Sequence, residues 1–251
     1  MLDFLLPVIV IFIVAPMVVG PFLVKFTHWI AAKAVIKTIL PEALDEKTKT
    51  FINQSKIELE ALGFQFAGYQ HMTDYMPKMT CYFGLFRHDN SKSAAMAAVI
   101  EHTSGRRLQY CEFSTTYSNG RIMDVSNSPE VAGYDIPDKV IYRYPKISSL
   151  RKLHEINQWV TARDPKKTVP VGLVADREAE MVAEALDREA SIQEKNGFYV
   201  LNENRSRYRL TWKGAFIMTE RQVFPFKQIL SYFDRQAAKK AIAGMPDTSI
   251  I

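Results

Sequence analysis

The feature that most constrains this chain lies near its start, where the stretch from Phe4 to Val24 contains no charged side chain. A helix rising about 1.5 Å per residue would make this stretch roughly 31 Å long, close to the hydrocarbon thickness of a bilayer. Backbone groups inside lipid must bond within their own segment, so a helix is the expected form. The sequence therefore predicts one transmembrane helix. The alternative, a buried helix of a globular core, is seldom so long.

Flanking charges predict how this helix is oriented. Asp3 precedes the stretch without any lysine or arginine, whereas a secretory signal peptide begins with positive charge. Lys25, Lys33 and Lys37 follow it, together with Trp29. Positive residues favour the cytoplasmic side, and tryptophan favours the lipid interface. We therefore expect these four residues at the membrane interface of a single-pass protein in the plasma (inner) membrane, with a short N-terminus outside and the C-terminal bulk cytoplasmic.

Composition sets few limits on the rest of the chain. Lys and Arg number 32 against 27 Asp and Glu, and this net charge of +5 suits an anionic membrane surface and nucleic acid alike. Cys81 and Cys111 have no metal-binding spacing and are expected to be two buried thiols. The sequence holds no phosphate-binding glycine loop, zinc-binding helix motif or nucleophile elbow. These observations favour a non-enzymatic role, and the sequence predicts no cofactor or metal.

The middle of the chain reads as an antiparallel β-meander covered by helices. A helix capped by Asp45 is expected to end near Leu62, and a second one capped by Ser148 is expected to end near Ala162. Between them, strands are predicted over residues 64–69, 79–87, 94–102, 108–117, 121–126 and 139–144. The segment 94–102 also has helix-forming residues, and we interpret it as a strand because of its even spacing from its neighbours.

The last part of the chain reads as a helix, a β-hairpin and further helices. A helix is expected over 176–195, a hairpin over 198–211, and a final amphipathic helix from Trp212, kinked or divided by Pro225. The polar segment 164–167 is the candidate linker. The predicted fold class is thus α+β, with three regions. They are a transmembrane anchor with a juxtamembrane amphipathic helix over 26–40 (together 1–40), an α+β meander domain (41–163) and a helix–β-hairpin–amphipathic helix region (164–251).

Two groups of polar side chains in the meander are candidate sites. His88 and His102 would lie near each other if their strands pair, but the alternation of side chains favours exposed turn residues over a metal site. Glu112, Ser114 and Thr116 share one face of a strand. Such a stripe is either the floor of a small-ligand site or an ordinary exposed sheet face, and the second is commoner.

The segment from Asn196 to Gly214 has a local resemblance. A helix ends, a short ribbon follows, and Leu210-Thr211-Trp212-Lys213-Gly214 opens the next helix. This segment is similar to the wing of winged-helix DNA-binding domains, in which a Leu-Thr-x-x-Gly run follows the second wing strand, and the resemblance implies DNA binding. The preceding helix is rich in Asp and Glu, however, and would repel phosphate, so nucleic acid is an unlikely partner.

Basic and aromatic residues alternate between Arg205 and Lys240. An amphipathic helix of this kind suits an anionic lipid surface or a partner protein, although an ordinary core helix with solvated charges has the same pattern. The residues predicted to form this surface are Arg207, Trp212, Lys213, Phe216, Phe224, Phe226 and Lys227.

Together these patterns predict a non-enzymatic, membrane-anchored protein whose cytoplasmic α+β module serves as a protein-interaction module or accessory subunit of a membrane complex. Its expected partners are the lipid bilayer and a membrane protein or complex, and whether it binds a small-molecule ligand is left open by the sequence. The alternative is a membrane-tethered nucleic-acid-binding regulator with a winged-helix-like C-terminal region. An enzyme acting on a lipid or small molecule is the third class.

Overall fold

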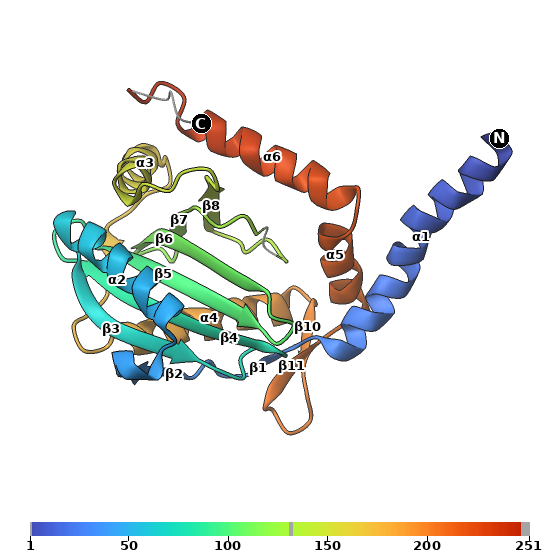
Figure 1. The fold of residues 1–251 in the computed structure, drawn as a ribbon, viewed down its shortest axis with the longest axis horizontal. Coiled ribbons are helices and arrows are strands. Elements are labelled where there is room, and N and C mark those ends of the chain that lie inside the picture. Colours follow the sequence, from blue (N-terminus) through green and yellow to red (C-terminus); the bar gives the residue numbers. More distant parts are fainter. Residues whose placement is uncertain (1, 131–132, 247–251) are drawn as a thin grey trace.

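A computed structural model describes residues 2–130 and 133–246, with the side chains of the first helix described from Ala15 onward. Most strands join one sheet of eight, ordered β2-β3-β4-β5-β6-β7-β8, with β9 paired to β6 (Figure 1). These strands are β2 (Ile36–Ile39), β3 (Gln65–Met72), β4 (Met79–His88), β5 (Ser93–His102), β6 (Arg107–Tyr117), β7 (Ile122–Ser126), β8 (Lys139–Arg143) and β9 (Pro170–Val171). Neighbours pair antiparallel except β7 and β8, which run parallel.

A second, three-stranded sheet joins distant parts of the chain. It consists of β1 (Trp29–Ala31), β11 (Arg207–Leu210) and β10 (Tyr199–Leu201), in that order. The helices are α1 (Leu2–Thr27), η1 (Pro41–Ala43), α2 (Glu46–Ala61), α3 (Leu150–Arg163), α4 (Glu178–Lys195), α5 (Trp212–Gln222) and α6 (Phe226–Ala241).

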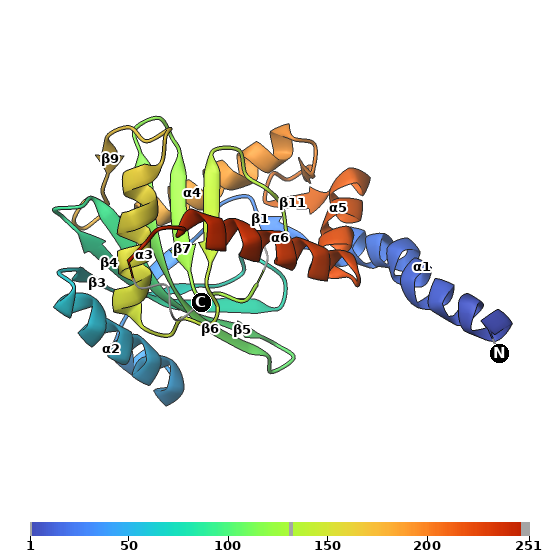
Figure 2. The same cartoon turned by 90° about the horizontal axis from the view of Figure 1, so that it is seen from above.

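Helices cover both faces of the large sheet. Figures 1 and 2 show α2 and α3 on one face and α4 on the other, while α1 extends away from the body. Three helices begin at side chains that bind free backbone N–H groups, which stabilises a helix start by about 1 kcal/mol. Asp45 accepts from Lys47 and Thr48 at the start of α2, Ser149 caps α3, and Thr211 accepts from Gly214 at the start of α5.

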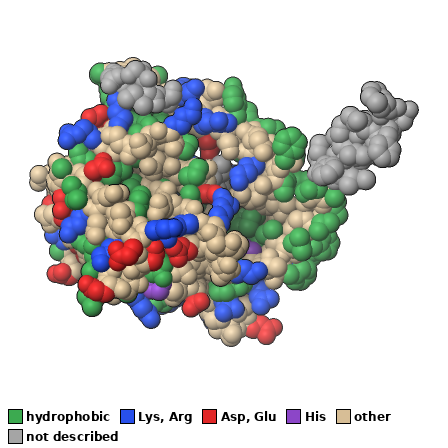
Figure 3. Space-filling model, in the orientation of Figure 1, with side chains coloured by type: hydrophobic (Ala, Val, Ile, Leu, Met, Phe, Trp, Pro, Cys, Tyr) green, Lys and Arg blue, Asp and Glu red, His purple; other side chains and the backbone are tan. Residues whose placement is uncertain are grey.

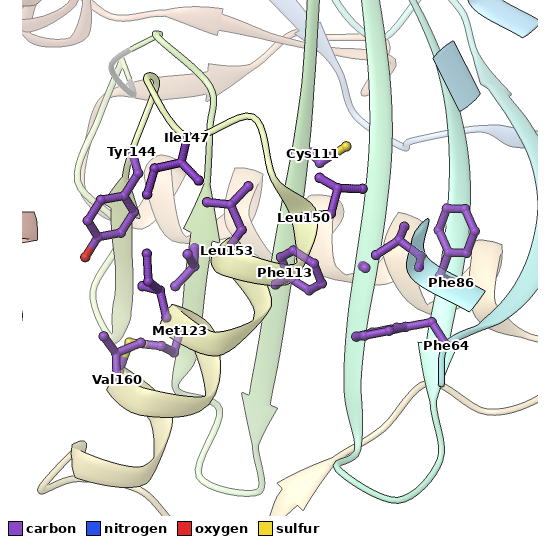
Figure 4. Packing of buried hydrophobic residues seen from close by; sticks show 14 of the residues in the cluster. Phe64, Phe86, Cys111, Phe113, Met123, Tyr144, Ile147, Leu150, Leu153 and Val160 are labelled. Carbon is purple, nitrogen blue, oxygen red and sulfur yellow. The ribbon is translucent and has the colours of Figure 1, made fainter. Parts of the chain in front are cut away.

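The main hydrophobic core lies between the sheet and helices α2 and α3. Its centre is Phe113 of β6, which is fully buried and packs edge-on against Phe64, with ring centroids 5.6 Å apart. Leu150, Leu153 and Val160 project from α3 toward the same strands (Figure 4). Because side chains alternate along β6, Cys111, Phe113 and Tyr117 point into this core. Glu112, Ser114 and Thr116 point to the opposite face, toward α4.

The predicted α+β class and β-meander are confirmed, and 93–102 is a strand as expected. The transmembrane prediction is wrong, because within the described part of the chain no helix is both long and apolar enough to cross a bilayer. This finding overturns the predicted single-pass topology and the predicted plasma-membrane location, with its outside N-terminus and cytoplasmic bulk. In its described part α1 packs on other elements: Gly20 lies against Thr219 of α5, and Lys25 Nζ donates to the Leu210 carbonyl at 2.5 Å.

Residues 26–40, predicted as a juxtamembrane amphipathic helix, also fold differently. The helix α1 ends at Thr27, and the chain then forms β1 and β2. The β1 strand pairs with β11, with Trp29 opposite Arg209. This pairing is set by a partner far along the sequence, which a local hydrophobic pattern does not reveal. The predicted division into three regions stays a prediction.

Candidate functional site

The polar stripe of β6 lies underneath helix α4. Glu112, Ser114 and Thr116 line a cavity of about 410 Å³ between the sheet and α4, which we call the α4 cavity. The preferred expectation of an exposed sheet face is therefore wrong, because α4 covers that face. Pockets of this size are typical of small-molecule sites.

Strand register brings an ion-pair cluster to the floor of this cavity. Ser114 of β6 pairs with Asp124 of β7, and the neighbouring strand β8 begins at Lys139. The Lys139 ammonium lies 3.3 Å from Asp124 Oδ2 and 2.6 Å from Glu189 Oε1 of α4. One lysine thus connects two strands to the helix that roofs the cavity.

The cluster has unusual electrostatics. Asp124 is 1% exposed, and its Oδ1 atom has no hydrogen-bond partner among the described residues. Burial, reinforced by the negative charge of Asp124, raises the pKa of Glu112 from 4.5 to about 8, with Lys139 opposing. Burial alone would lower the pKa of Lys139, but Asp124 and Glu189 raise it more. At neutral pH the cavity floor therefore holds a mostly protonated Glu112 beside a charged lysine.

The roof of the α4 cavity is partly apolar, and the helix that forms it is held in place by hydrogen bonds. Val182 and Leu186 of α4 line it. The first turn of α4 is held by Glu178, whose Oε1 accepts from Arg87 Nη1 at 2.6 Å. Farther along α4, Asp187 Oδ1 accepts from the Ala34 backbone N–H at 2.7 Å. These two hydrogen bonds tie α4 to β4 and to the connection between β1 and β2. They therefore fix the position of α4 over the sheet.

Glu112 gives this site a testable pH dependence. Its carboxyl has a higher pKa folded than unfolded, so the folded state holds the extra proton between pH 4.5 and about 8. The contribution of Glu112 to the free energy of unfolding must therefore fall as the pH rises through that window. Glu112→Gln is therefore expected to be more stable than the parent by about 2 to 4 kcal/mol above pH 8 and to match it near pH 4. Urea unfolding of both proteins from pH 4 to 9 measures the difference, and a difference independent of pH would contradict the assignment.

The acidic helix that precedes the wing-like hairpin is α4 itself. Strands β10 and β11 form the hairpin, and Thr211 caps α5 as the Leu-Thr-x-x-Gly run implies. In a winged-helix domain the helix before the wing would face DNA, yet here α4 packs on the large sheet and lines the cavity. We therefore do not propose nucleic-acid binding.

The residues predicted for the membrane interface are dispersed. Lys25 donates to the backbone of β11, and Trp29 lies under the Arg207 guanidinium, with the ring centroid 3.9 Å from the Arg207 Cζ atom. Lys33 and Lys37 are both exposed; Lys33 lies shortly before β2, and Lys37 lies within it.

The residues predicted for a partner or lipid surface fall into two groups. Trp212, Lys213 and Phe216 lie on α5 next to α1, where Phe22 packs edge-on against Trp212 with ring centroids 4.9 Å apart. Farther along the chain are Phe224, which is 63% exposed, and Phe226 and Lys227 at the start of α6. Arg207 belongs to neither group, since it stacks on Trp29.

The two histidines considered as a metal pair lie far apart. In the β4–β5 ladder His88 pairs with Ser93 and His102 pairs with Met79, so they occupy opposite ends of the hairpin. His88 instead stacks on His154 of α3, with ring centroids 6.2 Å apart. Burial and the neighbouring His88 lower the pKa of His154 to about 4. Among the described residues, no cluster of three or more His, Cys, Asp or Glu side chains is arranged to hold a metal ion.

Sequence reasoning found Glu112, Ser114 and Thr116 but missed Asp124, Lys139 and Glu189. The alternation of β7 around Asp124 was a usable signal, because a charged residue between Met123 and Val125 must face the opposite side from the core. Comparisons with known proteins add nothing to this description, since no family model, curated protein or solved structure matches the chain.

Proposed function

We propose that the chain is a non-enzymatic protein-interaction module, or an accessory subunit of a larger complex, that binds a partner protein through the junction of α1 and α5. We call this surface the aromatic face, formed by Phe22, Phe26, Trp212 and Phe216. Figure 3 shows hydrophobic side chains gathered where α1 meets the body of the molecule. The observation that carries the proposal is this exposed aromatic cluster, which spans two helices.

The aromatic face is exposed but ordered by its own contacts. Phe26 is 71% exposed, Phe22 52% and Phe216 48%. Trp212 lies between the two α1 rings, with its centroid 4.9 Å from Phe22 and 6.1 Å from Phe26. Val18 and Val19 extend the apolar surface along α1. Contiguous exposed apolar surface of this kind is characteristic of interaction sites.

The charges around the aromatic face indicate the chemistry of the partner. The Lys25 Nζ atom lies 5.9 Å from the Trp212 ring centroid. Lys213 of α5 and Arg209 of β11 are exposed. Aromatic residues and arginine are enriched at the centres of protein interfaces, and complementary charge at the rim directs association. The partner is therefore a protein with an apolar surface, such as the apolar side of an amphipathic helix, bordered by Asp and Glu.

Site-directed photo-crosslinking in the source cells tests this proposal. A benzophenone side chain placed at Phe26 should yield one discrete protein adduct, and the same group at Ile57 should not. Ile57 is the matched control because it is 70% exposed on α2, far from the aromatic face. Adding Phe216→Ser should lower the yield from Phe26 about tenfold, since central interface residues contribute most of the binding energy.

Two outcomes would overturn the proposal. The first is the same set of adducts from Phe26 and Ile57. The second is an adduct with lipid alone from Phe26, together with binding of the purified chain to anionic vesicles that Phe216→Ser abolishes.

A further inference from the structure

We propose that the α4 cavity is a binding site for a small primary amine with an apolar body. No residue of the aromatic face lines this cavity, so the inference stands independently of the proposed protein-interaction role. Three observations carry the inference: an unpaired buried acceptor, the sign of the surrounding charge, and an apolar remainder.

The unpaired acceptor is the Oδ1 atom of Asp124. This side chain is 2% exposed and lines the cavity, yet among the residues that the structure describes only its Oδ2 atom has a partner, the Lys139 ammonium 3.3 Å away. Leaving a buried carboxylate oxygen without a donor is costly, and native structures rarely do so. A ligand that supplies an N–H donor from within the cavity would remove this cost.

The surrounding charge selects a cation over an anion. Asp124 and Glu189 both lie next to Lys139, and Glu112 adds a third carboxyl group to the same end of the cavity. One ammonium therefore faces two carboxylates and a third carboxyl group that can ionise. The two further cations that line the cavity, Lys92 and Arg188, are both exposed to solvent, where their charge is screened, and the exposed Glu184 lines the cavity as well. A carboxylate or phosphate ligand would meet repulsion here, whereas an ammonium group would be attracted.

The rest of the cavity accepts an apolar body. Met96 of the sheet, Leu173 of the preceding loop, and Val182 and Leu186 of α4 line it. Apolar walls around a few placed polar groups are typical of small-molecule sites. Exposed lining residues, among them Lys92 and Glu184, mark the opening to solvent. The geometry thus fits a molecule with an ammonium group at one end and a ring or short aliphatic chain at the other.

Three probes of similar size and different charge test the inference on the unmodified full chain. They are 2-phenylethylamine, 2-phenylethanol and phenylacetate, each measured at pH 7 by ligand-observed NMR and calorimetry. The amine is expected to bind at least tenfold more tightly than the alcohol or the carboxylate, because a charge-assisted hydrogen bond is worth about a tenfold change or more in affinity. Failure of the amine to bind at millimolar concentration, or equal binding of all three probes, would overturn the proposal.

Two variants locate the binding. Asp124→Asn removes the acceptor charge and should weaken 2-phenylethylamine binding at least tenfold. Asp164→Asn is the matched control, because Asp164 is also a buried carboxylate, paired with Arg121 Nε at 2.6 Å, but lies outside the cavity. Ala185→Trp should block binding by filling the cavity from its roof. If Asp124→Asn and Ala185→Trp bind the amine as tightly as Asp164→Asn does, the amine binds elsewhere and the proposal is wrong. If a variant fails to fold, the comparison of the three probes on the parent chain tests the proposal by itself.

Discussion

Replacing Lys139 with methionine is expected to lower the free energy of unfolding by about 3 to 5 kcal/mol at pH 7. The lysine contacts Asp124 and Glu189, and Asp124 is almost completely buried. Removing the cation leaves buried carboxylates without compensation, which costs more than the pair itself contributes. It also removes the charge that holds down the pKa of Glu112, so that carboxyl should become still harder to ionise. Chemical denaturation of the parent and the variant measures the loss.

The same substitution at a surface lysine is the control. Lys56 pairs with Glu60 at 3.8 Å on α2, and both side chains are substantially exposed, so Lys56→Met should change stability by only about 0.5 kcal/mol or less. The deficit of Lys139→Met should also shrink on acidification, because protonation of the neighbouring carboxylates removes the uncompensated charge. A loss that is no larger than that of Lys56→Met would contradict the described cluster.

Phe113→Ala is expected to lower the free energy of unfolding by about 3 to 5 kcal/mol. Phe113 is fully buried in β6, and its ring contacts Phe64 and His154, with centroids 5.6 and 5.3 Å away. Removing the ring leaves a cavity between the sheet and both covering helices, which cannot collapse without moving α2 or α3. Thermal and urea unfolding of the variant provide the measurement.

Ile57→Ala is the control for this core substitution. Ile57 is 70% exposed on α2, so its loss should change stability by about 0.5 kcal/mol or less. If Phe113→Ala were as mild as Ile57→Ala, the side of β6 assigned to the core would be wrong.

Local patterns predicted much of the middle of the fold. The alternation of β6 correctly separates Phe113 from Glu112, because side chains of a strand point to opposite faces whatever else the chain does. Capping by Asp45 predicted the start of α2, since Asp satisfies free N–H groups at a helix start. Both signals depend only on residues that are neighbours in the sequence.

The errors arise where distant segments meet. Nothing near Glu112 in the sequence shows that α4, which begins at Glu178, covers it. Nothing in residues 26–40 shows that Trp29 pairs with Arg209. For the apolar N-terminal segment, hydrophobicity and length were interpreted as lipid contact, whereas its described part packs on Thr219 and Trp212 of α5. Hydrophobicity predicts burial but does not identify what covers the surface.

The covering of the polar β6 stripe by α4 is the claim on which the site depends, and the titration of Glu112 tests it most directly. The ¹³Cδ chemical shift of Glu112, followed by NMR from pH 3 to 10 and assigned with Glu112→Gln, reports when this carboxyl ionises. Burial next to Asp124 predicts a midpoint near the pKa of about 8. A midpoint near 4.5, the ordinary value for a solvent-exposed glutamate, would contradict the account.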